Sequence, residues 1–332
     1  MHINCPPSNP PLLKVQELSL SFPNQEHAVD RVSFELAAGK TLGLVGASGA
    51  GKSSIARTIL RLAEPYAGKI LFNGKSIFSM NREQLKEARQ RIQIVFQEPS
   101  ASLSPRRTVA QTLLEPLRHF AIGDANYRQD KIRQTLQTVG LNHDALQRYP
   151  NQFSSGQQQR IAIARALVTN PELLIADEAV SALDVSVQAQ ILQLIQSLQK
   201  DHGIAFLFIS HDLAVIRQIA DEVAVMYRGQ LLEHSPADMF FSRPAHPYSK
   251  ALLAFARFES SARLRTDQLP ASQGPGEHSS ACIYAGLCVD RMPVCERLEP
   301  EYHKIQHTEE PHCVKCHLYD EVHADDKLAD DN

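Results

Sequence analysis

A glycine-rich segment near the N-terminus has the residue types and spacing of a phosphate-binding loop. Residues 46–53 read G-A-S-G-A-G-K-S and match the pattern G-x-x-x-x-G-K-S/T. In such a loop, backbone N–H groups surround phosphate oxygens, and the N-terminus of the following helix adds partial positive charge. Lys52 would reach the β- and γ-phosphates, and the Ser53 hydroxyl would bind Mg²⁺. The alternative is a glycine-rich turn with an exposed lysine, which the strand pattern before the loop and the helical pattern after it disfavour.

Two acidic residues follow a second apolar run. Residues 173–176 predict a buried strand, and Asp177 and Glu178 come at its carboxyl end, where open α/β sheets place ligands. Asp177 is suited to the Mg²⁺ shell, and Glu178 is suited to orienting or deprotonating an attacking water. By itself this pair is more often a strand end with solvated charges. Together with the phosphate loop it indicates a phosphate site.

A third polar segment, residues 149–160, contains a Ser-Ser-Gly turn at 154–156 that leads into a helical run at 161–167. The free N–H groups at the start of that helix could face an anion. Taken alone, the segment is interpreted more simply as an N-capped helix.

Short β-rich runs alternate with helical stretches through most of the chain. The β-rich runs are 12–22, 32–36, 41–46, 92–97, 173–177, 205–210 and 222–227. Helical spacing is found at 52–62, 187–200 and 213–220. This alternation predicts a doubly wound α/β core. Residues 108–168 read almost entirely as helices, which predicts a helical insertion between two core strands.

Composition limits the class of protein. The chain has 332 residues and a net charge of -3, and no apolar run approaches the roughly 20 residues of a membrane helix. The N-terminus lacks the basic and apolar pattern of a secretory signal. Without the acidic last 15 residues, 33 bases face 31 acids, so a nucleic-acid partner is not expected.

In these motifs the chain resembles the ATP-binding cassette (ABC) ATPases over residues 12–256. The resemblance implies a P-loop NTPase core with a helical subdomain at about 108–168, ATP hydrolysis, and ATP and Mg²⁺ as ligands. It leaves residues 257–280 as a linker, 281–318 as a Cys-rich C-terminal segment and 319–332 as an acidic tail. The implied nucleotide contacts come from Phe22, Gly46, Ser48, Gly49, Gly51, Lys52, Ser53, Ser54, Gln97, Ser154, Gly156, Gln157, Asp177 and Asp184.

The resemblance also implies individual roles. The implied catalytic residues are Glu178, His211, Lys52 and Gln97, and the implied Mg²⁺ ligands are Ser53, Gln97 and Asp177. Phe22 would stack on adenine, Gln97 would sense Mg²⁺ and the membrane partner, and His211 would contact the γ-phosphate. Ser154, Gly156 and Gln157 belong to the segment that matches the family's signature, and they would bind the ATP held by a second subunit. Asp184, in S-A-L-D at 181–184, matches the family's D-loop. Each residue also has a purely structural alternative. Phe22 could be a core residue, Gln97 a strand-end amide and His211 a hydrogen-bonded strand-end histidine. The segment at 154–157 could be an N-capped helix, and Asp184 could be a helix cap.

Three positions depart from the family pattern. The family signature reads L-S-G-G-Q, and this chain has F-S-S-G-Q at 153–157, so Phe153 replaces the leucine. Ser155 stands where the signature has its first glycine, and its Cβ would hinder close approach of the backbone to a phosphate. Ala179 stands where a proline usually follows the glutamate.

Three further strings resemble the branch of oligopeptide/dipeptide importers, which also includes nickel importers and antimicrobial-peptide systems. They are Q-E-P-S-A-S-L-S-P-R at 97–106, D-V-S-V-Q-A-Q at 184–190 and A-H-P-Y-S-K at 245–250. Membership would imply a second ABC ATPase subunit, two transmembrane permease subunits and a periplasmic or extracellular solute-binding protein. It would also place the chain at the cytoplasmic face of the membrane. The rival hypothesis is a soluble ABC ATPase without a transport role.

Five of the six cysteines, at 282, 288, 295, 313 and 316, fall near the C-terminus. Disulfides are not expected in a cytosolic ATPase. Only Cys313 and Cys316 have zinc-knuckle spacing, so an iron–sulfur cluster, zinc and free thiols are all considered. Some members of the importer branch carry a [4Fe–4S] cluster in this segment. That resemblance implies Cys282, Cys288, Cys295 and Cys316 as ligands and leaves Cys313 extra.

Overall fold

Two β-sheets carry the fold of this computed structural model, which describes residues 11–22, 25–98, 102–259, 281–305 and 311–320. The larger sheet has the strand order β11-β12-β10-β9-β3-β8-β7-β6. Its parallel part consists of β9 (Glu222–Tyr227), β3 (Thr41–Val45), β8 (Ala205–Ile209), β7 (Leu173–Asp177) and β6 (Ile92–Val95). Its antiparallel part consists of β10 (Gln230–Pro236), β12 (Cys313–Lys315) and β11 (Tyr302–Lys304).

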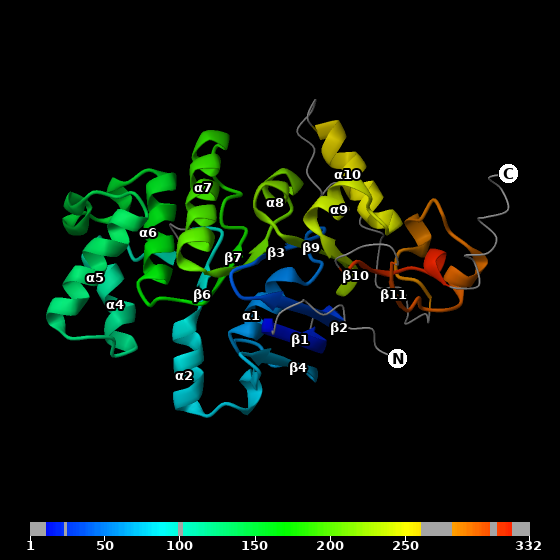
Figure 1. The fold of residues 1–332 in the computed structure, drawn as a ribbon, viewed down its shortest axis with the longest axis horizontal. Coiled ribbons are helices and arrows are strands. Elements are labelled where there is room, and N and C mark those ends of the chain that lie inside the picture. The colour runs from blue at the N-terminus through cyan, green and yellow to red at the C-terminus, as the bar shows by residue number, and fades with distance from the viewer. Residues whose placement is uncertain (1–10, 23–24, 99–101, 260–280, 306–310, 321–332) are drawn as a thin grey trace.

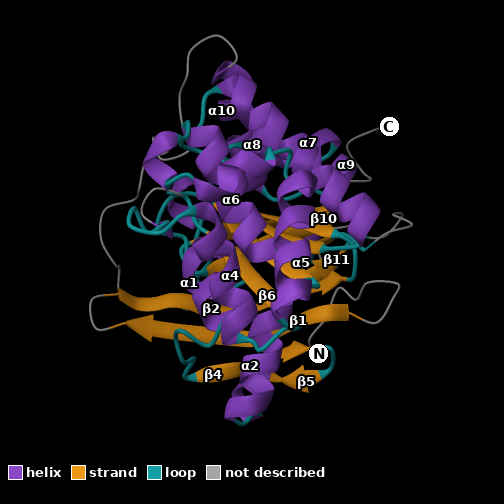
Figure 2. Cartoon of the chain, turned by 90° about the vertical axis from the view of Figure 1, so that its left-hand side faces the viewer, coloured by secondary structure: helices purple, strands orange, loops and turns teal. Residues whose placement is uncertain are grey.

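The smaller sheet is antiparallel and has the order β2-β1-β4-β5. Its strands are β2 (Gln25–Ala37), β1 (Pro11–Phe22), β4 (Ala67–Phe72) and β5 (Lys75–Ser76). Figure 2 shows this sheet below the larger one, with most of the helices on the opposite side.

Nine α-helices surround the sheets in the described residues. They are α1 (Lys52–Ile59), α2 (Arg82–Arg91), α4 (Val109–His119), α5 (Ala125–Thr138), α6 (Ser155–Leu167), α7 (Val185–His202), α8 (Leu213–Ile219), α9 (Ala237–Ser242) and α10 (Pro247–Glu259). Short 3₁₀ turns occupy Ile77–Ser79, His143–Gln147, Pro150–Gln152, Ala285–Leu287, Pro293–Glu296 and His317–Tyr319. In Figure 1, α4, α5 and α6 lie at one end of the molecule and the Cys-rich segment lies at the other. The predicted α/β core with a helical insertion is confirmed.

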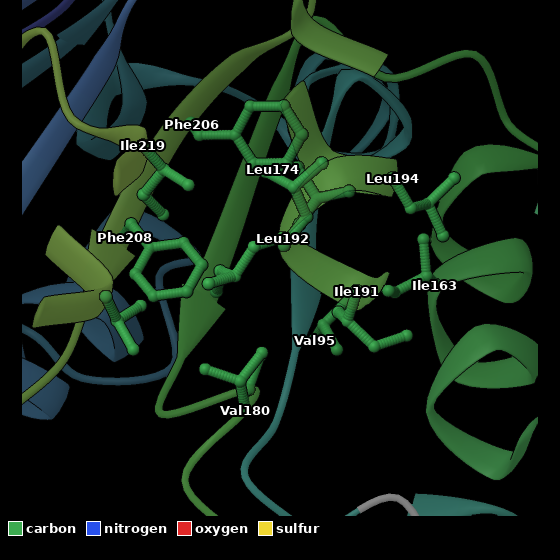
Figure 3. Close-up of a cluster of buried hydrophobic side chains, with 14 of the residues drawn as sticks. Val95, Ile163, Leu174, Val180, Ile191, Leu192, Leu194, Phe206, Phe208 and Ile219 are labelled. Atoms are coloured by element: carbon green, nitrogen blue, oxygen red, sulfur yellow. The ribbon is translucent and has the colours of Figure 1, made fainter. Parts of the chain in front are cut away.

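The hydrophobic core has two parts because side chains alternate across a strand. Phe206 and Phe208 of β8 point toward the helices, where they join one apolar cluster with α6, α7 and α8 (Figure 3). Leu207 and Ile209 of the same strand point the other way, into a second cluster with α1 and the smaller sheet. The larger sheet is therefore buried on both faces, which explains the continuous apolar runs in its parallel strands.

The Cys-rich segment continues the larger sheet. Strand β12 pairs with β10, so that Glu233 lies opposite Val314, and β11 pairs with β12. Outside the sheet, Glu299 binds both the Arg31 guanidinium, at 2.6 Å, and the Lys315 ammonium, at 2.6 Å. The contact with Arg31 holds the segment against β2, and the contact with Lys315 joins Glu299 to β12 within the segment. Helix α10 extends into the first residues of the predicted linker, and residues 260–280 and 321–332 lie outside the described part of the chain.

A buried carboxylate joins three distant segments next to this junction. Glu233 has no solvent exposure and accepts the N–H groups of Ala245 and His246 at 2.9 and 2.8 Å. The Nε2 atom of His312 lies 2.9 Å from the same carboxylate. Burial alone would raise the pKa of Glu233, but these hydrogen bonds outweigh burial and hold the pKa below its ordinary range. Glu233 therefore stays charged and ties β10 to α10 and to β12.

No helix in the described ranges is both long enough and apolar enough to pass through a lipid bilayer.

Because His246 is buried, we expect the stability of the fold to depend on pH. Burial lowers the pKa of this imidazole from 6.5 to about 4, so the folded chain keeps it neutral where the unfolded chain protonates it. Its contribution to stability is complete above about pH 6.5 and is lost as the pH falls toward 4. In His246→Asn the amide oxygen can replace Nδ1 as the acceptor of the Tyr248 N–H. We expect its melting temperature to fall less than that of the wild type between about pH 7 and 5. The exposed His119→Asn serves as control, and equal pH profiles for wild type and His246→Asn would contradict the assignment.

Candidate functional site

The glycine-rich loop connects β3 to α1 and has no space for side chains at two of its glycines. Gly46 and Gly51 have φ values of 146° and 99°, which L-residues with a Cβ rarely adopt. A Cβ at Gly46 would lie 2.1 Å from the Met226 carbonyl oxygen, and one at Gly51 would lie 2.2 Å from the Ala28 carbonyl oxygen. The surrounding backbone therefore requires glycine at both positions, and the loop backbone is left open at Ser48 and Gly49, which are exposed.

Lys52 is buried beneath the loop that it follows. Its Nζ donates hydrogen bonds to the carbonyl oxygens of Gly46, at 2.8 Å, and Ala47, at 2.9 Å. An ammonium has three donors, so one remains for a phosphate oxygen. Burial lowers the pKa of Lys52, while the nearby carboxylates of Glu178 and Asp177 act in the opposite direction. The ammonium of Lys52 is thus held in place by two backbone carbonyls of the loop.

Ser53 and Asp177 meet although 124 residues separate them in the sequence. The Ser53 hydroxyl donates a hydrogen bond of 3.0 Å to Oδ1 of Asp177, the last residue of β7. Burial raises the pKa of Asp177, and the hydrogen bond from Ser53 opposes this effect. A hydroxyl and a carboxylate are hard oxygen ligands of the kind that Mg²⁺ prefers. The pair therefore fits the predicted Mg²⁺ ligands.

Glu178 adopts a strained backbone conformation next to this pair. Its φ of 50° lies in the left-handed region, which is rare for a residue other than glycine. The conformation is held because the Glu178 N–H donates to the Ile209 carbonyl, and the Glu178 carbonyl accepts the Ser181 N–H. Its carboxylate lies 3.2 Å from Nδ1 of His211, just beyond β8, and both side chains are 24% exposed. The structure thus brings together a carboxylate and a histidine that water can reach.

The signature residues lie in a different part of the molecule. The Ser154 side chain accepts the Gln157 N–H at the start of α6, and the Gln157 side chain accepts the Ser154 N–H. Figure 1 shows α6 beside α4 and α5 at one end of the molecule, away from α1. The structural alternative, an N-capped helix, is therefore correct as a description of this segment within one chain. Ser155 is exposed at the first position of the helix.

Gly156 has a packing role inside the chain. A Cβ at this position would lie 2.3 Å from Cγ1 of Val187, a branched and short side chain in the first turn of α7. The first turn of α7 is in turn fixed by Asp184, whose carboxylate accepts the Val187 N–H at 3.0 Å and the Ser186 hydroxyl at 2.7 Å. Asp184 is thus a helix cap, as its structural alternative stated, and α6 and α7 meet at Gly156.

The remaining predicted residues are placed as follows. Gln97 is exposed just after β6, Ser54 lies in the first turn of α1, and Phe22 ends β1 with its side chain outside the described part. One loop contact was not predicted: the Tyr248 hydroxyl accepts the Ala47 N–H at 3.2 Å. The only sequence signal for it was the A-H-P-Y-S-K string, which contains this tyrosine but gives no hint of its partner.

The four predicted cluster ligands are free thiols that lie within electrostatic reach of one another. Burial raises the pKa of Cys316 to about 12, and Cys282, Cys288 and Cys295 contribute in the same direction. The Cys282 N–H donates to the Cys295 carbonyl at 2.9 Å. In the described ranges, no group of three or more His, Cys, Asp or Glu side chains is arranged to hold a single metal ion. None of these four cysteines is in a disulfide, whereas Cys313 is disulfide-bonded, so the expectation that the chain has no disulfide is wrong at Cys313.

Comparisons with known proteins agree with this architecture. Residues 29–181 match the family model described as ABC transporter. The chain is 43% identical to the oligopeptide transport ATP-binding protein AppF of Bacillus subtilis (strain 168), over 88% of this chain and 89% of AppF. Its fold resembles cbiO1 of Clostridium perfringens, part of the ABC transporter complex cbiONQ, with a TM-score of 0.65, 25% identity, and coverage of 76% of this chain and 99% of cbiO1. It also resembles the dimeric ATP-binding cassette MJ0796 bound to ADP and phosphate, with a TM-score of 0.61, 27% identity, and coverage of 68% of this chain and 98% of MJ0796.

The contact between Gly156 and Val187 generates a prediction about stability. Gly156→Ala forces α6 and α7 apart, and we expect a loss of about 1–3 kcal/mol in the free energy of unfolding, as is typical of overpacking. Val187→Ala removes the methyl group that the new Cβ would meet. Chemical denaturation should therefore show a smaller loss in the double variant than the sum of the two single losses. Additive losses would refute the packing role of Gly156.

Proposed function

This chain belongs to the ATP-binding proteins of the ABC transporter family for oligopeptide and peptide import, and we propose that it hydrolyses ATP at the site formed by Lys52, Ser53, Asp177, Glu178 and His211. It is the ATP-binding subunit of such a transporter and an ABC-type ATPase coupled to transport. Family membership removes the rival hypothesis of an ABC ATPase without a transport role. The observation that carries the proposed site is the convergence of these side chains at the ends of β3, β7 and β8.

The geometry supports in-line attack of water on the γ-phosphate. Lys52 would hold the phosphate end of the nucleotide through its remaining donor, and backbone N–H groups of the loop would bind the other oxygens. Mg²⁺, when bound, neutralises charge on the β- and γ-phosphate oxygens. Ser53 and Asp177 would hold this ion, and Gln97, which is exposed just after β6, would be its third protein ligand.

Glu178 is the general base in this proposal. Its carboxylate accepts a proton from the attacking water, because it is a solvent-accessible carboxylate held beside the phosphate loop. His211 lies on the same carboxylate and supplies a hydrogen-bond donor to the γ-phosphate when it turns from Glu178.

A second ABC ATPase subunit completes the site. The signature residues Ser154, Gly156 and Gln157 lie on α6, away from the phosphate loop of the same chain, so they are available to a loop on another subunit. Head-to-tail closure of two subunits, identical or different, would place each signature on the partner's ATP, with Phe22 stacked on the adenine of its own nucleotide. The exposed Ser155 would then lie close to that ATP, and its Cβ would weaken the contact.

The further partners are two transmembrane permease subunits and a periplasmic or extracellular solute-binding protein, with no nucleic acid. The chain would lie peripherally at the cytoplasmic face of the inner membrane and drive import of dipeptides or oligopeptides. Nickel and antimicrobial peptides remain the alternative solutes. Residues 12–256 form the ABC ATPase domain, with a helical subdomain at about 108–168, and residues 281–318 form the Cys-rich segment.

The Cys-rich segment would hold a [4Fe–4S] cluster on Cys282, Cys288, Cys295 and Cys316. The support is that four unpaired thiols gather in one place, two of them buried and two half-buried. A [4Fe–4S] cluster takes one thiolate on each of its irons, so its ligands need not converge on one point as those of a single ion do. This accounts for four interacting thiols that nevertheless do not form a site for one metal ion.

Replacement of the base tests the proposed chemistry. We expect Glu178→Gln to lower steady-state ATP hydrolysis by at least about 100-fold, because the amide cannot accept the proton. ATP binding should be retained, since Glu178 is not required to hold the phosphates. The matched control is Glu64→Gln, at an exposed position, measured by phosphate release and calorimetry. Unchanged hydrolysis in Glu178→Gln would show that another group is the base.

Metal analysis tests the cluster. The chain purified without oxygen should contain about four iron and four acid-labile sulfide per molecule, together with a brown colour. Cys316→Ser should lose most of the iron, whereas Cys313→Ser should keep it because Cys313 is not one of the four free thiols. One zinc per chain without sulfide, or thiols without metal, would refute the cluster. Equal iron in the two variants would refute the ligand assignment.

A further inference from the structure

One peptide group at the start of the phosphate loop is held at both of its edges. Its carbonyl, that of Gly46, accepts a hydrogen bond from Lys52 Nζ at 2.8 Å. Its N–H, that of Ala47, donates to the Tyr248 hydroxyl at 3.2 Å. Because a peptide group is planar and rigid, a rotation that breaks the contact with Tyr248 also moves the carbonyl that holds Lys52. The tyrosine hydroxyl therefore acts on the position of the lysine ammonium.

Tyr248 is well suited to this task because its ring is fixed. The residue is 2% exposed, and its ring packs against Tyr227 and Tyr284 with centroid distances of 4.7 and 5.3 Å. Tyr227 and Tyr284 also pack edge to face on each other at 5.4 Å. Burial raises the pKa of Tyr248 well above its ordinary value, so the hydroxyl stays neutral and keeps a lone pair for the Ala47 N–H.

The three rings come from different parts of the chain. Tyr227 ends β9, Tyr248 lies in the first turn of α10, and Tyr284 lies between the cysteines at 282 and 288. The backbone of Tyr248 is also fixed, because its N–H donates to His246 Nδ1 at 3.0 Å and the His246 N–H donates to the buried Glu233. The Cys-rich segment thus supplies one wall of the pocket that orients the tyrosine.

We propose that Tyr248 is a positioning residue for ATP binding: it orients the peptide between Gly46 and Ala47 and thereby Lys52, and Tyr284 of the Cys-rich segment braces it. This inference rests on the proposed role of Lys52 in the phosphate site. It gives the Cys-rich segment a direct mechanical connection to the phosphate loop, through one ring contact and one hydrogen bond.

Tyr248→Phe in the full chain tests the positioning role, because phenylalanine keeps the ring packing and removes only the hydroxyl. We expect the KM for ATP and the Kd for Mg–ATP to rise about threefold to tenfold, the effect of one hydrogen bond. The melting temperature should stay close to that of the wild type. A merely structural role would lower kcat through loss of active protein and leave KM unchanged. An unchanged KM would overturn the proposal.

The control is Tyr227→Phe, whose hydroxyl has no hydrogen-bond partner among the described residues and whose ring lies in the same triad. Its KM and Kd should equal those of the wild type, and a rise as large as in Tyr248→Phe would overturn the assignment to the Ala47 contact. Lys52→Ala separates the proposed phosphate site from the proposed positioning role of Tyr248. If Lys52→Ala binds ATP normally, the proposed phosphate site is wrong; if only Tyr248→Phe binds normally, the site stands and this inference fails.

Tyr284→Leu tests the brace. We expect it to raise the KM for ATP in the same direction, although its nearest link to the loop is the ring of Tyr248. The double variant with Tyr248→Phe should be no worse than the more affected single variant, because both act through one hydrogen bond. An unchanged KM in Tyr284→Leu would overturn the part assigned to the Cys-rich segment. If Tyr284→Leu does not fold, Tyr284→Met, with a flexible side chain that fills gaps, takes its place.

Discussion

The register of three parallel strands is the constraint on which the site depends. In the larger sheet, Ile209 of β8 lies between Leu44 of β3 and Asp177 of β7. Because the strands run in the same direction, the residues just beyond these positions emerge at one edge. The phosphate loop follows β3, Glu178 follows β7 and His211 follows β8. A slip of one residue in this register would turn the apolar side chains of a strand to the wrong face and separate the polar groups.

The polar groups at this edge of the sheet are held in position by their neighbours in the fold. The loop has no room for side chains because the carbonyls of Ala28 and Met226 lie against its glycines, so its backbone takes the conformation that those neighbours allow. Lys52 is held by two loop carbonyls, and the strained backbone of Glu178 is held by hydrogen bonds on both sides. The loop, Lys52 and Glu178 of the proposed site are therefore held in place by the chain itself, and such preorganisation would lower the cost of binding a nucleotide.

The Cys-rich segment is part of the same body and not a separate appendage. It continues the sheet through β12, shares the buried carboxylate of Glu233 with α10, and binds Arg31 through Glu299. The ring of Tyr284 carries this connection to within one side chain of the phosphate loop. Any change in the cysteine cluster that moves Tyr284 would therefore be transmitted to the loop through packed side chains.

The sequence by itself determined the elements whose signals are local. The apolar runs predicted the parallel strands, helical spacing predicted α1, α7 and α8, and the loop pattern located Lys52 between a strand and a helix. It did not predict β4, β5, β10, α2 or α9, because these elements are short or polar and have weak periodicity. Only the tertiary structure decided that Tyr248 meets Ala47, that Gly156 faces Val187, and that Tyr284 packs against Tyr248. Such contacts join residues far apart in the chain and depend on how the elements pack, which local spacing does not encode.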